Sequence, residues 1–215
     1  MQLYGYWRSS TAYRIRIALN IKGIEAEQRF VNLREGEQGG ESHRRRNPLG
    51  RVPVLVDGDA TLTQSLAILE YLDERYPEPP LLPDDAIDRA RVRALAQVVG
   101  CDIHPLDNLS VLKYLQSELG ASDEQKLEWY RHWVKQGFDA LETMLAGDER
   151  TDRFCHGDKP GLADVCLVPQ VYNARRFDCD LETYPTITRI DAACAQLDAF
   201  RRAIPEAQPD ATGTG

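Results

Sequence analysis

The feature that most constrains this chain is a cluster of prolines, four of them among the seven residues 77–83. Proline lacks a backbone N–H and clashes with the preceding helical turn, so neither a helix nor a central strand can continue through such a segment. The cluster therefore predicts a linker between two domains, residues 1–80 and residues 86–204. We expect residues 205–215 to form a disordered tail. The chain has 215 residues and 42% hydrophobic content, which is enough to bury a sizeable core.

The first domain carries the local signals of a mixed α/β layer. An aromatic strand ends at Trp7, and apolar residues then recur at helical spacing over residues 12–19. Residues 29–33 favour a second strand, and an Asp57-Gly58 turn joins two more strands into a hairpin. A helix follows, with Ser65 as its expected N-cap. This order of strand, helix, three strands and helix is typical of a thioredoxin-like domain.

Between these elements, residues 34–47 are polar and end in the basic run His43-Arg44-Arg45-Arg46. We expect this stretch to be a solvated loop. The alternative is an edge that steers or binds an anionic ligand.

After the proline cluster the apolar spacing is helical and no convincing strand pattern occurs. The expected helical segments are 86–118, 123–146, 161–176 and 186–203. Pro105 is expected to kink the first of them. The predicted fold class is therefore α+β, with an N-terminal thioredoxin-like α/β domain followed by an all-α helical bundle.

The charge and the cysteines exclude several function classes. A net charge of −8 argues against nucleic acid as a partner, because phosphate backbones are bound through clustered Lys and Arg. No apolar run reaches membrane-spanning length and no secretory signal precedes the first strand, so we expect no membrane partner and a cytoplasmic location. The five cysteines are scattered and never spaced as C-x-x-C, which favours reduced thiols and no metal site.

The turn between the first strand and its helix is the chief candidate for chemistry. Ser9, Ser10 and Thr11 lie where the helix begins, so their hydroxyls and the free N–H groups of the first turn share one small volume that suits an anion. The structural alternative is that one hydroxyl is only an N-cap. A C-x-x-C at this turn would indicate a thioredoxin-like redox site, but here Ser9 to Ala12 occupy those places. The turn could therefore stabilise a thiolate only if another molecule supplies it.

The run Arg8-Ser9-Ser10, followed by Arg14-Ile15-Arg16-Ile17-Ala18-Leu19, resembles the zeta class of glutathione transferases, which includes maleylacetoacetate and maleylpyruvate isomerases. Many members have Ser-Ser-Cys, whereas Thr11 stands in place of the cysteine here, which argues against a role for a protein thiol. The resemblance implies the glutathione transferase fold, glutathione as cofactor, and Ser9, Ser10 and Arg8 as catalytic residues. We favour Ser9 for the contact to sulfur.

The same resemblance assigns the other glutathione contacts. It implies that Ser9 and Thr11 bind glutathione and that a cis Val52-Pro53 bond lets the Val52 backbone pair with its cysteinyl part. The pair Gln64-Ser65 would hold the γ-glutamyl end, since a carboxylate at a helix N-terminus meets free N–H groups.

Two sites in the helical domain complete the resemblance. His104 and Asn108 are four residues apart, hence on one face if the helix continues through Pro105, and they are expected near glutathione. Arg176 precedes a phenylalanine in a stretch close to the zeta class, which implies that it binds a substrate carboxylate together with Arg8. The alternatives are a structural histidine and a surface arginine.

The resemblance implies a glutathione-dependent cis–trans isomerase that acts on a small dianionic keto acid, either maleylacetoacetate or maleylpyruvate, in the catabolism of tyrosine or aromatic compounds. A homodimer is expected on the same ground. Two alternatives stay open: a glutathione transferase that acts on small α-halo acids, and a non-catalytic adaptor with the same fold.

Overall fold

The computed structural model describes residues 1–211 and divides the chain into two compact units. The first unit comprises Met1–Leu81 together with the segment that starts at Ala195, and the second unit is Leu82–Cys194. The boundary at Leu81 falls inside the proline cluster, as predicted. The predicted split differs at the other end, because residues 195–204 belong to the first unit and not to the helical one.

The first unit is built on a four-stranded sheet in the order β2-β1-β3-β4. Its strands are β1 (Gln2–Gly5), β2 (Glu27–Phe30), β3 (Val54–Asp57) and β4 (Ala60–Thr63). Strand β1 runs parallel to β2 and antiparallel to β3, and the Asp57-Gly58 turn joins β3 to β4 as a hairpin. The sheet confirms the predicted mixed α/β layer.

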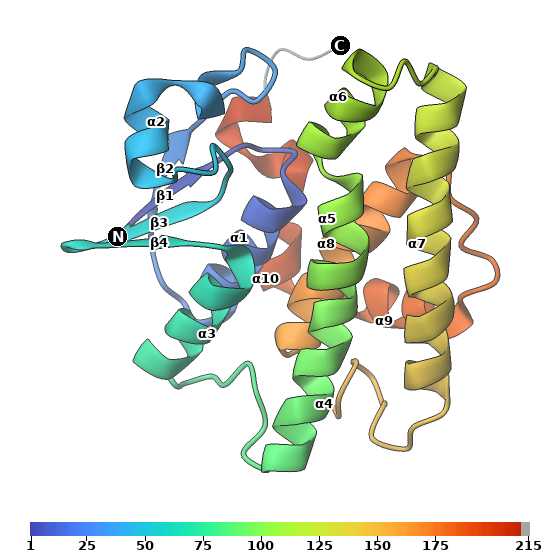
Figure 1. The fold of residues 1–215 in the computed structure, drawn as a ribbon. Helices are drawn as coiled ribbons and strands as arrows, with labels where there is room; N and C mark the ends of the chain where they lie inside the picture. Colours follow the sequence, from blue (N-terminus) through green and yellow to red (C-terminus); the bar gives the residue numbers. More distant parts are fainter. Residues whose placement is uncertain (212–215) are drawn as a thin grey trace. The chain divides into compact units, whose positions relative to one another are not determined.

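Two helices cover the buried side of this sheet, α1 (Ser10–Ile21) and α3 (Ser65–Arg75), which pack against each other (Figure 1). Helix α1 has nine buried residues, among them Ile15 and Ile17, and α3 buries Ile68, Leu69 and Leu72. Burying side chains of this size stabilises the unit by about 1.5–3 kcal/mol each relative to leaving them exposed. This packing holds the two helices in place against the sheet, and the N-termini of both carry residues that the sequence analysis singled out.

The expectation of a loop over residues 34–47 is wrong. The chain forms a 3₁₀ turn, η1 (Glu37–Gly39), and a short helix, α2 (Glu41–Arg46). The helix buries only His43, whose Nε2 lies 2.9 Å from the Arg51 carbonyl oxygen. Its basic side chains are held locally, with Arg45 paired to Glu41. A six-residue helix without an apolar stripe leaves no periodic pattern in the sequence, which is why it was missed.

The predicted disordered tail is also wrong for residues 205–211. This stretch forms two 3₁₀ turns, η3 (Pro205–Ala207) and η4 (Pro209–Ala211), after the short helix α10 (Asp198–Arg201). Pro205 is buried, and Asp210 accepts a hydrogen bond from the Trp7 backbone N–H. Residues 212–215 of the predicted tail lie outside the described residues.

The second unit contains helices and no strand, which confirms the predicted all-α unit. Its elements are α4 (Ala86–Gln97), the π-helical segment η2 (Val98–Ile103), α5 (His104–Asp107), α6 (Leu109–Ser117), α7 (Asp123–Ala146), α8 (Leu162–Arg176) and α9 (Pro185–Cys194). The single helix predicted over 86–118 is therefore four segments. The π-helical turn precedes Pro105, and the helix breaks again at Asn108, which has extended backbone angles.

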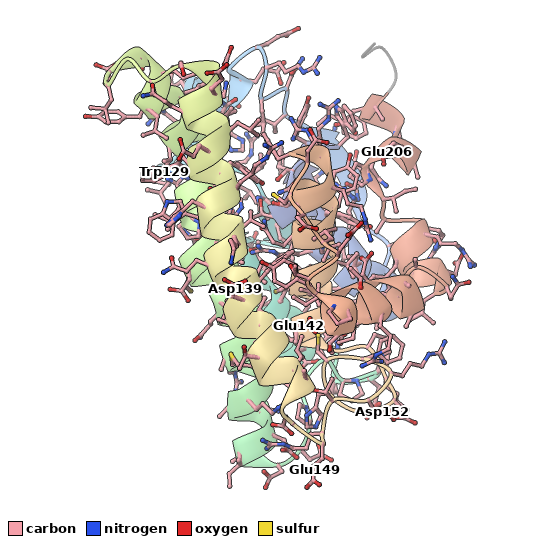
Figure 2. All side chains as sticks on the ribbon, turned by 90° about the vertical axis from the view of Figure 1, so that its right-hand side faces the viewer. Trp129, Asp139, Glu142, Glu149, Asp152 and Glu206 are labelled. Atoms are coloured by element: carbon pink, nitrogen blue, oxygen red, sulfur yellow. The ribbon has the colours of Figure 1, made fainter. Side chains whose placement is uncertain are left out.

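Polar side chains fix the ends of the long helices in this unit. Ser122 begins α7 with a capping box to Gln125, and the Asp164 carboxylate accepts from the Gly161 N–H at the start of α8. Glu142, which Figure 2 labels along α7, accepts the first N–H groups of α9 at 2.8 and 3.0 Å. A carboxylate at a helix N-terminus is stabilised by the helix dipole, so Glu142 ties α9 to α7.

Candidate functional site

The register of the sheet gathers three loop ends of the first unit at one edge. Tyr4 lies opposite Val54, and Val54 lies opposite Thr63. Consequently the turn that follows β1, the loop that precedes β3 and the start of α3 after β4 all lie at the same end of the sheet. These three segments carry Ser9, Val52 and Ser65 respectively.

Ser9, Thr11 and Val52 form one hydrogen-bonded cluster. The Ser9 Oγ lies 2.9 Å from the Thr11 Oγ1, and the Thr11 Oγ1 donates to the Val52 carbonyl oxygen at 3.1 Å. Because that carbonyl can only accept, the hydrogen between the two hydroxyls belongs to Ser9. The Ser9 Oγ in turn accepts from the Ala12 N–H at 3.2 Å and caps α1. The capping reading and the binding reading of this serine are therefore compatible.

The structure separates the two serines of the turn. Ser10 is the first residue of α1 and is 5% exposed, whereas Ser9 is partly exposed at the helix N-cap. The N–H groups of the first turn of α1 open toward the Ser9 side of the helix end. These observations support Ser9 over Ser10 as the hydroxyl that meets a bound group.

The N-terminus of α3 is arranged differently from the sequence expectation. Its N-cap is Gln64 and not Ser65, and Gln64 has a φ of 68°, a left-handed conformation that is uncommon outside glycine. The Gln64 side chain is exposed and makes no capping hydrogen bond, so this helix does not begin with the predicted Ser65 cap. Ser65 is the first helical residue, is 7% exposed, and its Oγ accepts from Arg14 Nη1 at 3.1 Å.

Arg14 is a component of this site that the sequence reasoning missed. It is 1% exposed inside α1, and its guanidinium reaches the first residue of α3. A positive charge beneath a helix N-terminus adds to the dipole of that helix and favours an anion there. The sequence does contain a signal, because Arg14 lies among the apolar residues of the first predicted helix. A charged residue is rarely buried without a partner, so an arginine at this place indicates a buried polar contact.

Arg8 lies next to this cluster, with its guanidinium carbon 4.1 Å from the centre of the Trp7 ring. Trp7 itself is 5% exposed, so the ring is a fixed platform for a partly exposed cation. Val52 and Pro53 are joined by a cis peptide bond, as the resemblance implied. Within the first unit, the predicted residues from Arg8 to Ser65 thus come together at one end of the sheet.

In the second unit, His104 and Asn108 do not share a helix face, which corrects the sequence expectation. His104 begins α5, whereas Asn108 lies outside that helix and is the N-cap of α6. The Asn108 Oδ1 accepts from the N–H groups of Ser110 and Val111, and its Nδ2 donates to the Pro105 carbonyl at 2.6 Å. The Asn108 side chain therefore has an architectural role at the break between α5 and α6.

Arg176 ends α8 with an exposed side chain whose guanidinium carbon lies 4.9 Å from the centre of the Phe177 ring. Phe177 stacks on Tyr130 with ring centres 3.7 Å apart. Arg176 is close enough to the Tyr130 hydroxyl to lower its pKa, although burial raises the pKa of Tyr130 overall. Its neighbour Arg175 instead pairs with Asp191 at 2.7 Å. Of the two arginines, Arg176 is thus the one beside the aromatic pair.

Asp107 is a second residue that the sequence did not single out. It is 6% exposed at the end of α5, and neither carboxyl oxygen has a hydrogen-bond partner among the described residues. Burial raises the pKa of Asp107 to about 8, and the carboxyl in turn raises the pKa of Tyr130. At neutral pH this side chain is therefore mostly a neutral acid.

The residues of the first unit fit glutathione, a tripeptide with a thiol and a γ-glutamyl carboxylate. The Ser9 hydroxyl carries a hydrogen that can be redirected to sulfur, because Thr11 keeps its own hydrogen bond to Val52. The start of α3, above the buried Arg14, suits the carboxylate. The protein holds its five cysteines elsewhere as free thiols, so the turn has no thiol of its own.

Comparison with known proteins agrees with this fit. Residues 1–74 match the family described as glutathione S-transferase, N-terminal domain. A Vibrio cholerae protein described as a probable maleylacetoacetate isomerase is 53% identical over 213 residues, which cover 97% of each chain. A solved structure described as holo maleylpyruvate isomerase, a bacterial glutathione S-transferase of the zeta class, superposes with a TM-score of 0.96 at 51% identity, covering 98% of this chain and 99% of the other.

This chain belongs to the zeta class of glutathione transferases. Another similar protein, described as the maleylacetoacetate isomerase of Methylobacterium extorquens, was solved with malonate and glutathione bound. It superposes with a TM-score of 0.95 at 45% identity over 97% of this chain and 98% of its own. The zeta-class assignment and the predicted glutathione transferase fold are thereby confirmed. No helix within residues 1–211 is long and apolar enough to cross a membrane.

Proposed function

We propose that this zeta-class protein is a glutathione-dependent cis–trans isomerase of a maleyl keto diacid, either maleylacetoacetate or maleylpyruvate. The observation that carries the proposal is the Ser9 hydroxyl, held between the Ala12 N–H and Thr11 at a helix N-terminus that lacks a cysteine. When bound, glutathione would supply a thiolate whose C–S bond to the substrate forms as the double bond becomes a rotatable single bond and breaks as the double bond reforms, so that glutathione would be regenerated.

The first task of the protein is to keep that thiol ionised. The Ser9 O–H and the N–H groups of the first turn of α1 donate to sulfur, and the dipole of α1 favours its negative charge. Each unit by which the thiol pKa falls requires about 1.4 kcal/mol of preference for the thiolate. Thr11 bonds to both the Ser9 hydroxyl and the Val52 carbonyl oxygen, and this link keeps the Ser9 hydroxyl in place.

The second task is to bind the tripeptide in one orientation. Gln64 and Ser65 bind the γ-glutamyl end at the start of α3, where Arg14 adds a buried positive charge. The Val52 backbone and Pro53 bind the cysteinyl part, and His104 is a further contact. Fixing the thiol in this way makes its attack on the substrate effectively intramolecular.

The third task is to hold a dianion. Arg8 and Arg176 bind the two carboxylates of the substrate, since a guanidinium matches a carboxylate with two parallel hydrogen bonds and stays charged. The same charges stabilise the negative charge that develops on the ketone oxygen when the thiolate adds. Ser10 is assigned a supporting role as the buried first residue of α1.

Two further expectations accompany this function. Glutathione is the thiol of reducing compartments, and all five cysteines are free, which supports a cytoplasmic location. The protein is expected to act as a homodimer, which light scattering of the purified chain would test. Neither location nor assembly changes the roles assigned above.

The test is an absorbance assay of isomerisation for both diacids, with glutathione at about one hundredth of the substrate concentration. We expect complete conversion that requires glutathione and leaves it unconsumed. If conversion stops after one equivalent of glutathione has been consumed, or if only α-halo acids react, the protein is a transferase that conjugates glutathione to its substrate. Glutathione binding without any turnover would favour the adaptor.

A matched pair of variants tests the substrate contact. Arg176→Ala is expected to lower kcat/KM for the diacid at least about tenfold, equivalent to about 1.4 kcal/mol. Arg175→Ala removes the neighbouring arginine, whose pairing with Asp191 is structural, and is expected to change protein stability but not the KM for substrate. Equal kinetic effects of the two changes would refute the assignment.

A further inference from the structure

The backbone of Trp7 is held on both sides by side chains of its own unit. The Trp7 N–H donates to the Asp210 Oδ2 at 2.9 Å, and the Trp7 carbonyl accepts from Arg16 Nη2 at 2.9 Å. Strand β1 ends at Gly5, so this peptide has no strand partner of its own. Because buried backbone groups must be paired, Asp210 and Arg16 supply what the sheet does not.

The segment that carries Asp210 is anchored to α1 along its length. Arg16 Nε donates to the Ala203 carbonyl at 3.1 Å, and Asn20 Nδ2 donates to the Ala199 carbonyl at 2.8 Å. Figure 1 shows α10 next to α1, in agreement with these bonds. The segment that carries Asp210 is therefore held against α1 by several hydrogen bonds, and these place Asp210 next to Trp7.

Trp7 is also the platform of the candidate catalytic turn. The Arg8 guanidinium lies over the Trp7 ring at 4.1 Å, and the Ser9 N–H donates to the Tyr6 carbonyl at 3.0 Å. Moving the Trp7 peptide would therefore move the next two residues, which carry the proposed carboxylate contact and the proposed thiol contact. Small displacements of such groups cost catalysis heavily.

We propose that Asp210 is a positioning residue for the isomerisation, acting through Trp7 to fix the guanidinium of Arg8. The inference rests on the proposed function, since it is the Arg8 contact with the dianionic substrate that Asp210 serves. A carboxylate suits this task because a hydrogen bond from N–H to an ionised acceptor is roughly twice as strong as one between neutral groups. The residue lies 203 positions from its partner, so no local sequence pattern points to it.

The experiment compares Asp210→Ala, Asp210→Asn and the control Asp198→Ala, whose carboxylate pairs with the exposed side chains of Arg201 and Arg202. Three quantities are measured: the KM for the diacid at saturating glutathione, the KM for glutathione at saturating diacid, and the affinity of the glutathione-loaded protein for malonate by calorimetry. Thermal unfolding of each variant provides the stability.

Asp210→Ala is expected to raise the substrate KM and weaken malonate binding at least fivefold, with the KM for glutathione changed less than twofold. Asp210→Asn retains an acceptor oxygen and is expected to restore most of the affinity, while Asp198→Ala matches the wild type. Unchanged substrate and malonate binding in Asp210→Ala would overturn the inference. Equal increases in the KM for glutathione and the KM for the diacid, together with a fall in Tm, would also overturn it, because they would indicate a purely structural role. If the wild type neither isomerises the diacid nor binds malonate, the proposed function fails first.

Discussion

The wild-type protein is expected to become less stable as the pH rises above about 4, because Asp107 is buried. Replacing Asp107 with asparagine is expected to remove this pH-dependent loss of stability. The carboxyl is 6% exposed, and neither oxygen has a partner among the described residues. Burial raises its pKa to about 8. In the unfolded chain the same group titrates near its ordinary value of about 3.9.

The sign follows from which state holds the proton. Between about pH 4 and pH 8 the folded protein keeps Asp107 protonated, whereas the unfolded chain releases the proton. Unfolding therefore becomes more favourable as the pH rises, and the loss is complete above the folded pKa. From about pH 5 to pH 8 the slope of about 1.4 kcal/mol per pH unit amounts to roughly 4 kcal/mol. Relaxation around the charge reduces this figure, so we expect at least about 2 kcal/mol.

The assay is urea unfolding at several pH values from 5 to 8 for the wild type, Asp107→Asn and the control Asp139→Asn. Asp139 lies in the same unit (Figure 2), but its Lys135 partner lowers its pKa, so its contribution is constant across this range. The free energy of unfolding of Asp107→Asn is expected to fall less with pH than that of the other two proteins. Parallel curves for all three would refute the reasoning, because Asp107 would then be ionised in the folded state across this pH range, as it is in the unfolded chain.

Two further predictions concern packing and charge inside each unit. Lys22→Met is expected to lower the free energy of unfolding by about 3–5 kcal/mol, because the buried Nζ pairs with Asp73 and two carbonyls, and its loss leaves a buried carboxylate. Urea unfolding checks this, and a change under 1 kcal/mol would contradict it. Gly137→Ala is expected to cost about 1–3 kcal/mol in thermal unfolding, because its Cβ would overlap the Ile103 side chain. An unchanged Tm would show that Ile103 can move aside.

The parts of the fold that the sequence predicts are those with local signals. Four prolines mark the boundary near Leu81, and Asp57-Gly58 marks the hairpin, because both act through backbone chemistry of neighbouring residues. The long helix α7 follows from sustained apolar spacing over residues 123–146. Helix α2 was missed since it has almost no apolar face.

The site was predictable to the extent that it lies in short motifs. The turn at Ser9 and the start of α3 come together because sheet register places both at one edge, which alternating strands and a hairpin already imply. Asp210 could not be found this way, since its contact with Trp7 joins distant parts of the chain. The capping role of Asn108 could not be predicted either, because Pro105 indicates a kink but does not show that the helix ends before Asn108 and begins again after it.

The central claim is that the Ser9 turn ionises the thiol of bound glutathione, and the most direct test is the pKa of that thiol. Thiolate absorbance of the glutathione complex would be titrated for the wild type, Ser9→Ala and the control Ser122→Ala, which removes a helix cap in the other unit. In the wild type we expect a pKa at least about one unit below the value near 8.5 of a free thiol. Ser9→Ala should return it toward that value, and Ser122→Ala should leave it unchanged. The same pKa in the wild type and in Ser9→Ala would contradict the account.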